Sequence, residues 1–312
     1  MRKLRSIIIG MILSTSIYAM DESVSLKYNW QPGMVSNVKY SFTKTKSYNG
    51  QTQKRQMVGT YVVKTSLHKD GLQLDFSDHK MEMNMDSDSQ QNKLQQAIQK
   101  ISQIMPSYII NKKGELIEVI GLEELKTAME DQIREIFKNS PVEMQQKMDQ
   151  LMQQILSKPQ IMAQLQDEWN RDVGQWLGAT FEKGYVYNIE FASPVPMLGN
   201  KSILTKGEYS YLGPSKCQDH DKDQKCVKLR FESYLDQNAT TTVLNEMFGS
   251  MGVTSPEAFD LKADYKLEII TDPISLRPYK IKATNTVSSP VQGSTESVLQ
   301  VDEKNYSFTY IK

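Results

Sequence analysis

The stretch from Leu122 to Leu177 constrains the fold most strongly, because it carries apolar residues at helical spacing in three consecutive runs. Steps of three and four residues place side chains on one face of an α-helix. Ser140-Pro141 is typical of a helix start, Pro159 interrupts the pattern, and Gly178 stands where helices commonly end. The sequence therefore predicts three amphipathic helices over residues 122–178.

Both flanks of this stretch alternate apolar and polar residues with a period of two. Val38, Tyr40 and Phe42 are one example, and residues 306–310 repeat the pattern near the end of the chain. Such strands bury one face and expose the other to solvent, which is typical of antiparallel sheets. We therefore predict an α+β fold, in which curved antiparallel β-sheets flank a central three-helix insert.

The order of features before the helices recurs after them. Trp30 and Gly33 begin the first series of strands and turns, and Trp176 and Gly184 begin the second. This order favours duplicated half-barrel units, although any antiparallel meander gives a similar order. The predicted organisation is a β-rich part over 20–121 with a short helix near 92–105, the helical insert over 122–178, and a second β-rich part over 179–312.

Residues 1–19 have the three-part layout of a secretory signal peptide. A basic start at Arg2, Lys3 and Arg5 precedes an apolar run, and small residues lead to Ala19. We expect cleavage near Ala19 and export to the periplasm or beyond. The apolar run is shorter than the roughly 20 residues that a transmembrane helix needs. No transmembrane helix is expected in the mature chain.

The charge balance excludes one class of partner. The chain has 37 basic and 37 acidic residues, and loss of the signal would leave a formal charge of −3. No segment is strongly basic. Nucleic acid is therefore not an expected partner.

The only two cysteines are Cys217 and Cys226. In an oxidising compartment, an isolated pair separated by a polar loop favours a disulfide. The alternative is a zinc site that the two thiolates form with His220 and a further acidic ligand.

Motifs for catalysis are absent from the sequence. The histidines are His68, His79 and His220, and none lies in an HExxH motif. No serine has the context of a nucleophile elbow, and no glycine-rich phosphate loop occurs. We therefore expect a non-enzymatic protein without a cofactor.

One cluster of soft ligands stands out. Met81, Met83 and Met85 occupy alternate positions shortly after His79. On an extended strand, their thioethers would share one face, which is a donor set suited to Cu(I). Packing of the same methionines against the helices is the alternative.

Several of these segments together resemble a family of exported bacterial proteins of unknown function, with β-rich flanks around a helical insert. The resemblance lies in Gly33–Tyr40, in Asn111-Lys-Lys-Gly114, in the helical stretch up to Trp176, and in Gly207-Glu-Tyr209. A curved sheet with helices on its concave side is also similar, in architecture alone, to the half-barrel lipoprotein carriers of the bacterial envelope. Architecture says little about function, and the resemblance implies no chemistry.

The expected function is that of an exported, non-enzymatic cell-envelope protein. Its ligand would be a hydrophobic molecule (lipid or peptide) or a partner protein, held between sheet and helices. The alternatives are a periplasmic Cu(I)-binding protein that uses the methionine cluster and a purely structural envelope component. The candidate ligand contacts are Phe137, Met148, Leu151, Met152, Trp169 and Trp176.

Overall fold

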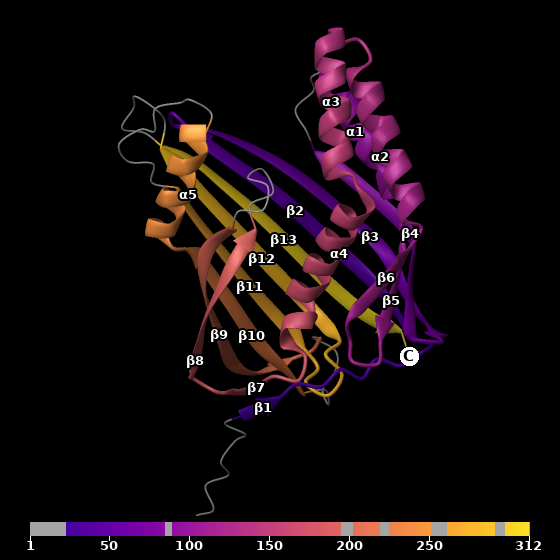
Figure 1. Cartoon of the computed structure of the whole chain (residues 1–312). Helices are drawn as coiled ribbons and strands as arrows, with labels where there is room; N and C mark the ends of the chain where they lie inside the picture. The colour runs from indigo at the N-terminus through magenta and orange to yellow at the C-terminus, as the bar shows by residue number, and fades with distance from the viewer. Residues whose placement is uncertain are drawn as a thin grey trace, which may run out of the picture.

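Figure 1 shows the computed structural model of the chain, which describes residues 23–84, 89–194, 202–218, 225–250, 261–290 and 297–311. The signal peptide predicted over 1–19 lies outside these residues. The main strands are β2 (Val35–Tyr48), β3 (Gln51–His68), β4 (Gly71–Asn84), β5 (Ser107–Asn111), β6 (Leu116–Ile120), β8 (Val186–Pro194), β9 (Ser202–Lys216), β10 (Lys225–Leu235), β11 (Lys262–Thr271), β12 (Pro278–Pro290) and β13 (Ser297–Ile311).

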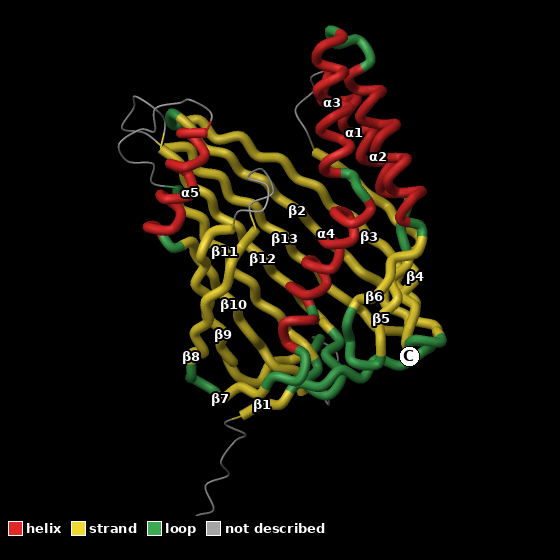
Figure 2. The backbone as a smooth tube through the Cα atoms, in the orientation of Figure 1, coloured by secondary structure: helices red, strands yellow, loops and turns green. Residues whose placement is uncertain are grey.

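These strands form one antiparallel sheet of eleven strands, in the order β6-β5-β4-β3-β2-β13-β12-β11-β10-β9-β8. Neighbours in the sheet are also consecutive along the chain, except where β13 pairs with β2 from Leu299↔Ser47 to Ile311↔Val35. The β-rich parts before and after the helices therefore share a single sheet. The sheet is curved but not closed, because β6 and β8 end it without pairing with each other (Figure 2). The predicted α+β class with antiparallel strands is confirmed.

Five helices accompany the sheet among the described residues: α1 (Ser89–Ser102), α2 (Leu122–Phe137), α3 (Val142–Ile155), α4 (Lys158–Asp172) and α5 (Gln237–Ser250). Helices α1, α2 and α3 stack at the β4 side of the sheet, and α4 crosses in front of its concave face (Figure 1). A short 3-10 helix, η1 (Gly174–Trp176), follows α4. No described helix has both the length and the apolar character needed to cross a membrane.

Among the described residues, the buried core has two large clusters and a small third one, which contains Cys217, Cys226 and Tyr279. The C-terminal cluster is centred on Trp176, Leu229, Leu267 and Ile269. The N-terminal cluster is centred on Leu72, Leu74, Ile110, Leu116 and Trp169.

The segment before β2 closes one end of the sheet. Strand β1 (Ser23–Ser25) pairs with β7 (Thr180–Glu182), and Leu26 is buried in the C-terminal cluster. Tyr28 and Trp30 then pack against the N-terminal cluster. This segment therefore contacts both halves of the core.

A β-bulge in β4 sets which of its residues face the helices. The pairing with β3 shifts between Thr60 and Val62, and Asp78 has a positive φ of 54°. An extra residue in a strand reverses the alternation of the side chains beyond it. As a result His79, Met81 and Met83 are half-buried, while the residues between them are exposed.

Candidate ligand-binding site

Helix α4 is fixed to the N-terminal half of the sheet by Trp169. The Trp169 Nε1 donates a hydrogen bond to the carbonyl of Gly114, at 2.8 Å. Gly114 closes the β5–β6 turn with a φ of +91°, and a Cβ there would lie 2.7 Å from Leu177 and 2.8 Å from Tyr28. Asn111 supports the turn by accepting hydrogen bonds from two backbone amides. The Asn-Lys-Lys-Gly segment therefore positions α4 as well as joining two strands.

The segment that follows α4 is fixed to the C-terminal half of the sheet. Trp176, in η1, is fully buried and makes edge contacts with Phe181 and Tyr209. The Tyr209 hydroxyl also donates to Gln175 Oε1, at 3.1 Å. Helix α4 and η1 are thus held by one tryptophan in each half of the core.

Between these two attachments, a cavity of about 170 Å³ lies under α4, which we call the aromatic cavity. Its strand residues are dominated by rings, and neighbouring rings are in contact: the Phe76 and Tyr108 centroids are 5.0 Å apart. Glu168 and Asp172 contribute carboxylates from α4. The rings that line it are Trp30, Tyr61, Phe76, Tyr108, Trp169, Tyr306 and Phe308.

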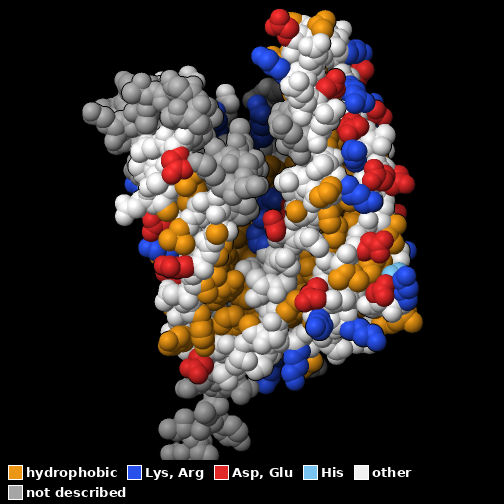
Figure 3. Space-filling view, viewed as in Figure 1, with side chains coloured by type: hydrophobic (Ala, Val, Ile, Leu, Met, Phe, Trp, Pro, Cys, Tyr) orange, Lys and Arg blue, Asp and Glu red, His pale blue; other side chains and the backbone are white. Residues whose placement is uncertain are grey.

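Two larger cavities accompany the aromatic cavity along α4. One, of about 440 Å³, shares Glu168, Asp172 and Tyr306 with it and extends over β12 and β13. Another, of about 470 Å³, lies toward β8 and β9 and includes Phe191 and Phe231. In Figure 3 the molecule is hollowed beside α4, and hydrophobic side chains gather over the strands on the left of the view. The concave face is therefore covered only in part.

The carboxylates of α4 differ in their partners. Glu168 lies 3.6 Å from the Lys304 ammonium and 3.8 Å from the Arg171 guanidinium. Asp172 forms no ion pair or side-chain hydrogen bond with another described residue. Burial raises the pKa of Asp172 to about 6 and is the largest cause of the shift. The charge of Arg171 opposes it, Glu168 raises the pKa by a smaller amount, and Lys304 lowers it by less still.

Tyrosine hydroxyls surround Asp172. Burial raises the pKa values of Tyr61, Tyr108, Tyr265 and Tyr306, so these hydroxyls stay protonated. The Tyr265 hydroxyl and the Trp30 Nε1 are buried without a hydrogen-bond partner in the described part of the chain. Buried polar groups are normally satisfied, and one without a partner needs an explanation.

The structure brings part of the predicted copper set together. His79, Met81 and Met83 lie on one face of β4, whereas Met85 lies outside the described residues. The Tyr40 hydroxyl is 2.8 Å from His79 Nε2, and the two rings are parallel. Within the described ranges, no group of three or more His, Cys, Asp or Glu could hold a metal ion. The methionine-based copper site stays a prediction.

The six predicted ligand contacts do not line one cavity. Trp169 lines the aromatic cavity, Met152 packs in the N-terminal cluster and Trp176 in the C-terminal cluster. Phe137 and Met148 are half-buried on α2 and α3. The side chain of Leu151 lies outside the described part of the chain.

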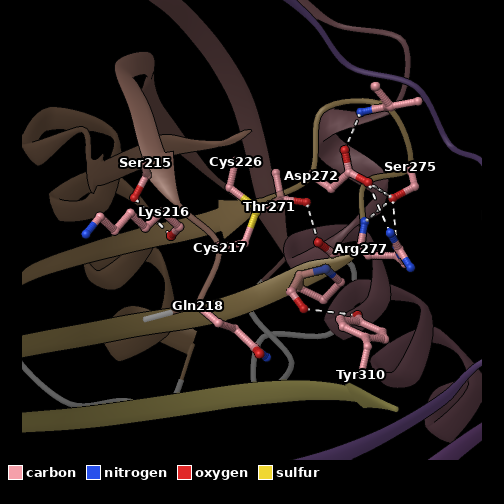
Figure 4. Close-up of a disulfide and its surroundings, with 12 residues drawn as sticks. Ser215, Lys216, Cys217, Gln218, Cys226, Thr271, Asp272, Ser275, Arg277 and Tyr310 are labelled. Atoms are coloured by element: carbon pink, nitrogen blue, oxygen red, sulfur yellow. Dashed lines mark hydrogen bonds and ion pairs between the residues drawn. A yellow bond between two sulfur atoms is a disulfide. The ribbon is translucent and has the colours of Figure 1, made fainter. Parts of the chain in front are cut away.

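The predicted disulfide between Cys217 and Cys226 is confirmed, with a Cα–Cα distance of 5.0 Å (Figure 4). A bonded pair cannot supply two thiolates, so the zinc alternative is wrong; His220 lies outside the described residues. Nearby, the Tyr310 hydroxyl donates to the carbonyl of Pro278 at 3.0 Å. The bond links the ends of β9 and β10, away from α4.

No protein-family model matches this chain, and no curated protein is significantly similar to it.

Proposed function

We propose that this chain is an exported, non-enzymatic protein of the cell envelope that binds a hydrophobic ligand between its sheet and α4. One observation carries the proposal: the concave face is rich in aromatic side chains, yet α4 leaves cavities along its length. Ligand sites are typically concave, mainly apolar and equipped with a few placed polar groups. The aromatic cavity has this composition.

The energetics of packing support a site over a solid core. An unfilled cavity forfeits dispersion contacts, and a buried hydroxyl without a partner costs about 1–3 kcal/mol. The aromatic cavity combines empty volume with the unpaired Trp30 Nε1, and the Tyr265 hydroxyl is unpaired in the adjoining cavity. A bound molecule would fill the volume and could supply the missing partners.

Two features support export. The basic and apolar pattern of residues 1–19 is typical of a secretory signal. The Cys217–Cys226 disulfide is of the kind that persists in oxidising compartments. We therefore propose that the protein works in the periplasm or outside the cell.

The proposal extends to the origin of the sheet. We infer that one half-barrel unit was duplicated to give two, and that the helices of residues 122–178 are an insert between the two copies. The two sequential meanders, β2–β6 and β8–β13, support this interpretation because they flank the helices and meet where β13 pairs with β2.

Native mass spectrometry of protein purified from its own compartment tests the function. We expect a lipid-sized mass increment on the wild type and on Val58→Phe, because Val58 is exposed on the opposite face of β3. Val63→Phe, which fills the aromatic cavity from the same strand, should lose the increment while keeping its circular dichroism spectrum. Repeated wild-type preparations without any increment would contradict the proposal and favour a purely structural component.

Copper binding is the second candidate, and the shared face of His79, Met81 and Met83 favours it. The test is the Cu(I) affinity of a Met81→Leu/Met83→Leu variant, measured by competition with a chromogenic chelator. The copper hypothesis predicts an affinity loss of at least about tenfold, because soft thioethers are its main donors. Equal affinities would exclude it.

A further inference from the structure

The charged side chains that line the aromatic cavity are all acidic. Among the described residues that line it, Glu168 and Asp172 are the charged side chains. Glu168 has two cationic neighbours within 4.0 Å, Lys304 and Arg171. Asp172 has no such partner among the described residues, although burial already penalises its charged form. The cavity therefore presents one carboxylate without a counter-charge in direct contact, although Arg171 and Lys304 act on it from farther away.

The surroundings of Asp172 are suited to a cation. The faces of aromatic rings attract cations, most strongly where water is excluded, and rings grouped around a site are the usual way to hold an alkylated ammonium. Tyr61, Tyr108 and Tyr306 line the cavity together with Asp172. The adjoining cavity already holds one cation against a ring, because the Arg171 guanidinium lies 5.8 Å from the centroid of Tyr265.

We infer that the ligand of the aromatic cavity is a cationic amphiphile whose ammonium group pairs with Asp172 against the rings of Tyr61, Tyr108 and Tyr306. This inference rests on the proposed function and specifies its ligand. A volume of about 170 Å³ suits a small ammonium head. The adjoining cavity, which shares Asp172 and Tyr306, offers about 440 Å³, where the apolar part would lie along Phe42, Ile281 and Ala283. The charged side chains of Arg171, Asp302 and Lys304 also line this cavity.

Other headgroups satisfy the site less well. A carboxylate or phosphate would add negative charge beside Asp172 and would compete with Glu168 for Lys304 and Arg171. A neutral headgroup would fill space but leave Asp172 without a counter-charge. The selectivity between the three charge types therefore reports on the role of Asp172.

Calorimetric titration of the full protein with three dodecyl compounds, each below its micellar concentration, tests the inference. The probes are dodecyltrimethylammonium, dodecyl sulfate and dodecyl maltoside. We expect the ammonium compound to bind at least about tenfold more tightly than the other two. Asp172→Asn should abolish this preference and leave the maltoside affinity unchanged, whereas Asp131→Asn, on the exposed face of α2, should change nothing.

The pH dependence gives a second measurement. The charged groups that act on Asp172 are Arg171, Glu168 and Lys304, and Asp302 lines the adjoining cavity with it. The hydroxyls of four tyrosines also face it: Tyr61, Tyr108, Tyr265 and Tyr306. The tyrosines remain neutral in the tested range, so Asp172 is the group expected to titrate near pH 6. Affinity for the ammonium compound should rise severalfold from pH 5 to pH 7 in the wild type and stay level in Asp172→Asn.

Two substitutions of Tyr306 separate loss of binding from failure to fold. Tyr306→Phe keeps the ring and should keep the ammonium affinity, whereas Tyr306→Leu should lose about tenfold. If all three probes bind equally, or the sulfate binds most tightly, the cationic ligand is wrong while a hydrophobic site remains. If no probe binds, the proposed function fails as well.

Discussion

The C-terminal cluster and the aromatic cavity are built on the same face of the same sheet, but they differ in how they are filled. In the cluster, Leu229 and Leu267 are 0% exposed, and Trp176 fills the space above them. In the aromatic cavity, Tyr61 and Tyr306 stay half-buried beside about 170 Å³ of empty volume. One half of the concave face is a core, and the other has the features of a site.

The alternation of side chains along a strand determines which residues face inward, but it does not determine whether they fill the space there. Alternation determines which residues face α4 in both halves. Rings occur in both halves, since Trp176, Phe181 and Phe231 are buried in the C-terminal cluster. The difference is that α4 brings the carboxylates of Glu168 and Asp172 to the aromatic cavity, where they keep the surrounding space from being filled by apolar side chains.

Replacement of Trp176 by alanine should produce the largest effect on stability. A fully buried tryptophan removed from a filled core costs about 3–5 kcal/mol of unfolding free energy. Tyr306→Leu, in the aromatic cavity, should cost less than half of that, because its surroundings already contain a void. Urea unfolding followed by circular dichroism measures both. Equal losses of unfolding free energy would contradict the proposed difference between a filled core and a cavity.

Removal of the disulfide should destabilise the protein without affecting the site. The double variant Cys217→Ser/Cys226→Ser should lose about 2–4 kcal/mol, the usual contribution of a bond that restricts the unfolded chain. The bond joins β9 and β10 and does not line the aromatic cavity. Dodecyltrimethylammonium affinity at 15 °C should stay within twofold of the wild type. A larger loss of affinity would show that the disulfide affects the aromatic cavity.

The stability contribution of Asp172 should depend on pH. Its pKa is about 6 in the folded protein against an ordinary value of 3.8, so the folded state retains the proton to higher pH. Without ligand, the free energy of unfolding should therefore fall as pH rises from about 4 to about 6 and then level off.

Asp172→Asn removes this fall. The variant should match the wild type below pH 4 and exceed it by about 1–2 kcal/mol at pH 7, a value reduced for partial solvation. Urea titrations at pH 3.5, 5, 6 and 7 measure the difference. A gap that is independent of pH would show that Asp172 is not desolvated.

The smallest predicted effect concerns the attachment of α4. Trp169→Phe deletes the hydrogen bond to Gly114 but keeps a ring in place, which should cost about 1 kcal/mol. Amide hydrogen exchange should accelerate in α4 and not in β10 or β11. Uniform acceleration would mean that α4 does not move as a separate unit.

Much of the fold could be predicted from the sequence because its signals are local. The alternation around Val38 and Phe42 and the Asn111–Gly114 turn are properties of short segments. The single sheet could not be predicted in the same way. It depends on the pairing of β13 with β2, whose partners Tyr306 and Tyr40 are far apart in the chain.

The site was largely missed for a related reason. Among the five predicted contacts whose side chains the structure describes, Trp169 alone lines the aromatic cavity. Tyr306 and Tyr61 were visible as inward strand residues, but only the curvature of the sheet brings them to α4. Asp172 carries no motif, and its lack of a partner is a property of the folded protein.

Tryptophan fluorescence offers the most direct test of the claim that ligand enters the aromatic cavity and not the C-terminal cluster. The chain has three tryptophans: Trp30 and Trp169 line the cavity, and Trp176 lies in the cluster. Titration of Trp176→Phe with dodecyltrimethylammonium should reproduce the full emission change of the wild type. Loss of that change in a folded Trp176→Phe variant, with its retention in Trp169→Phe, would contradict the account.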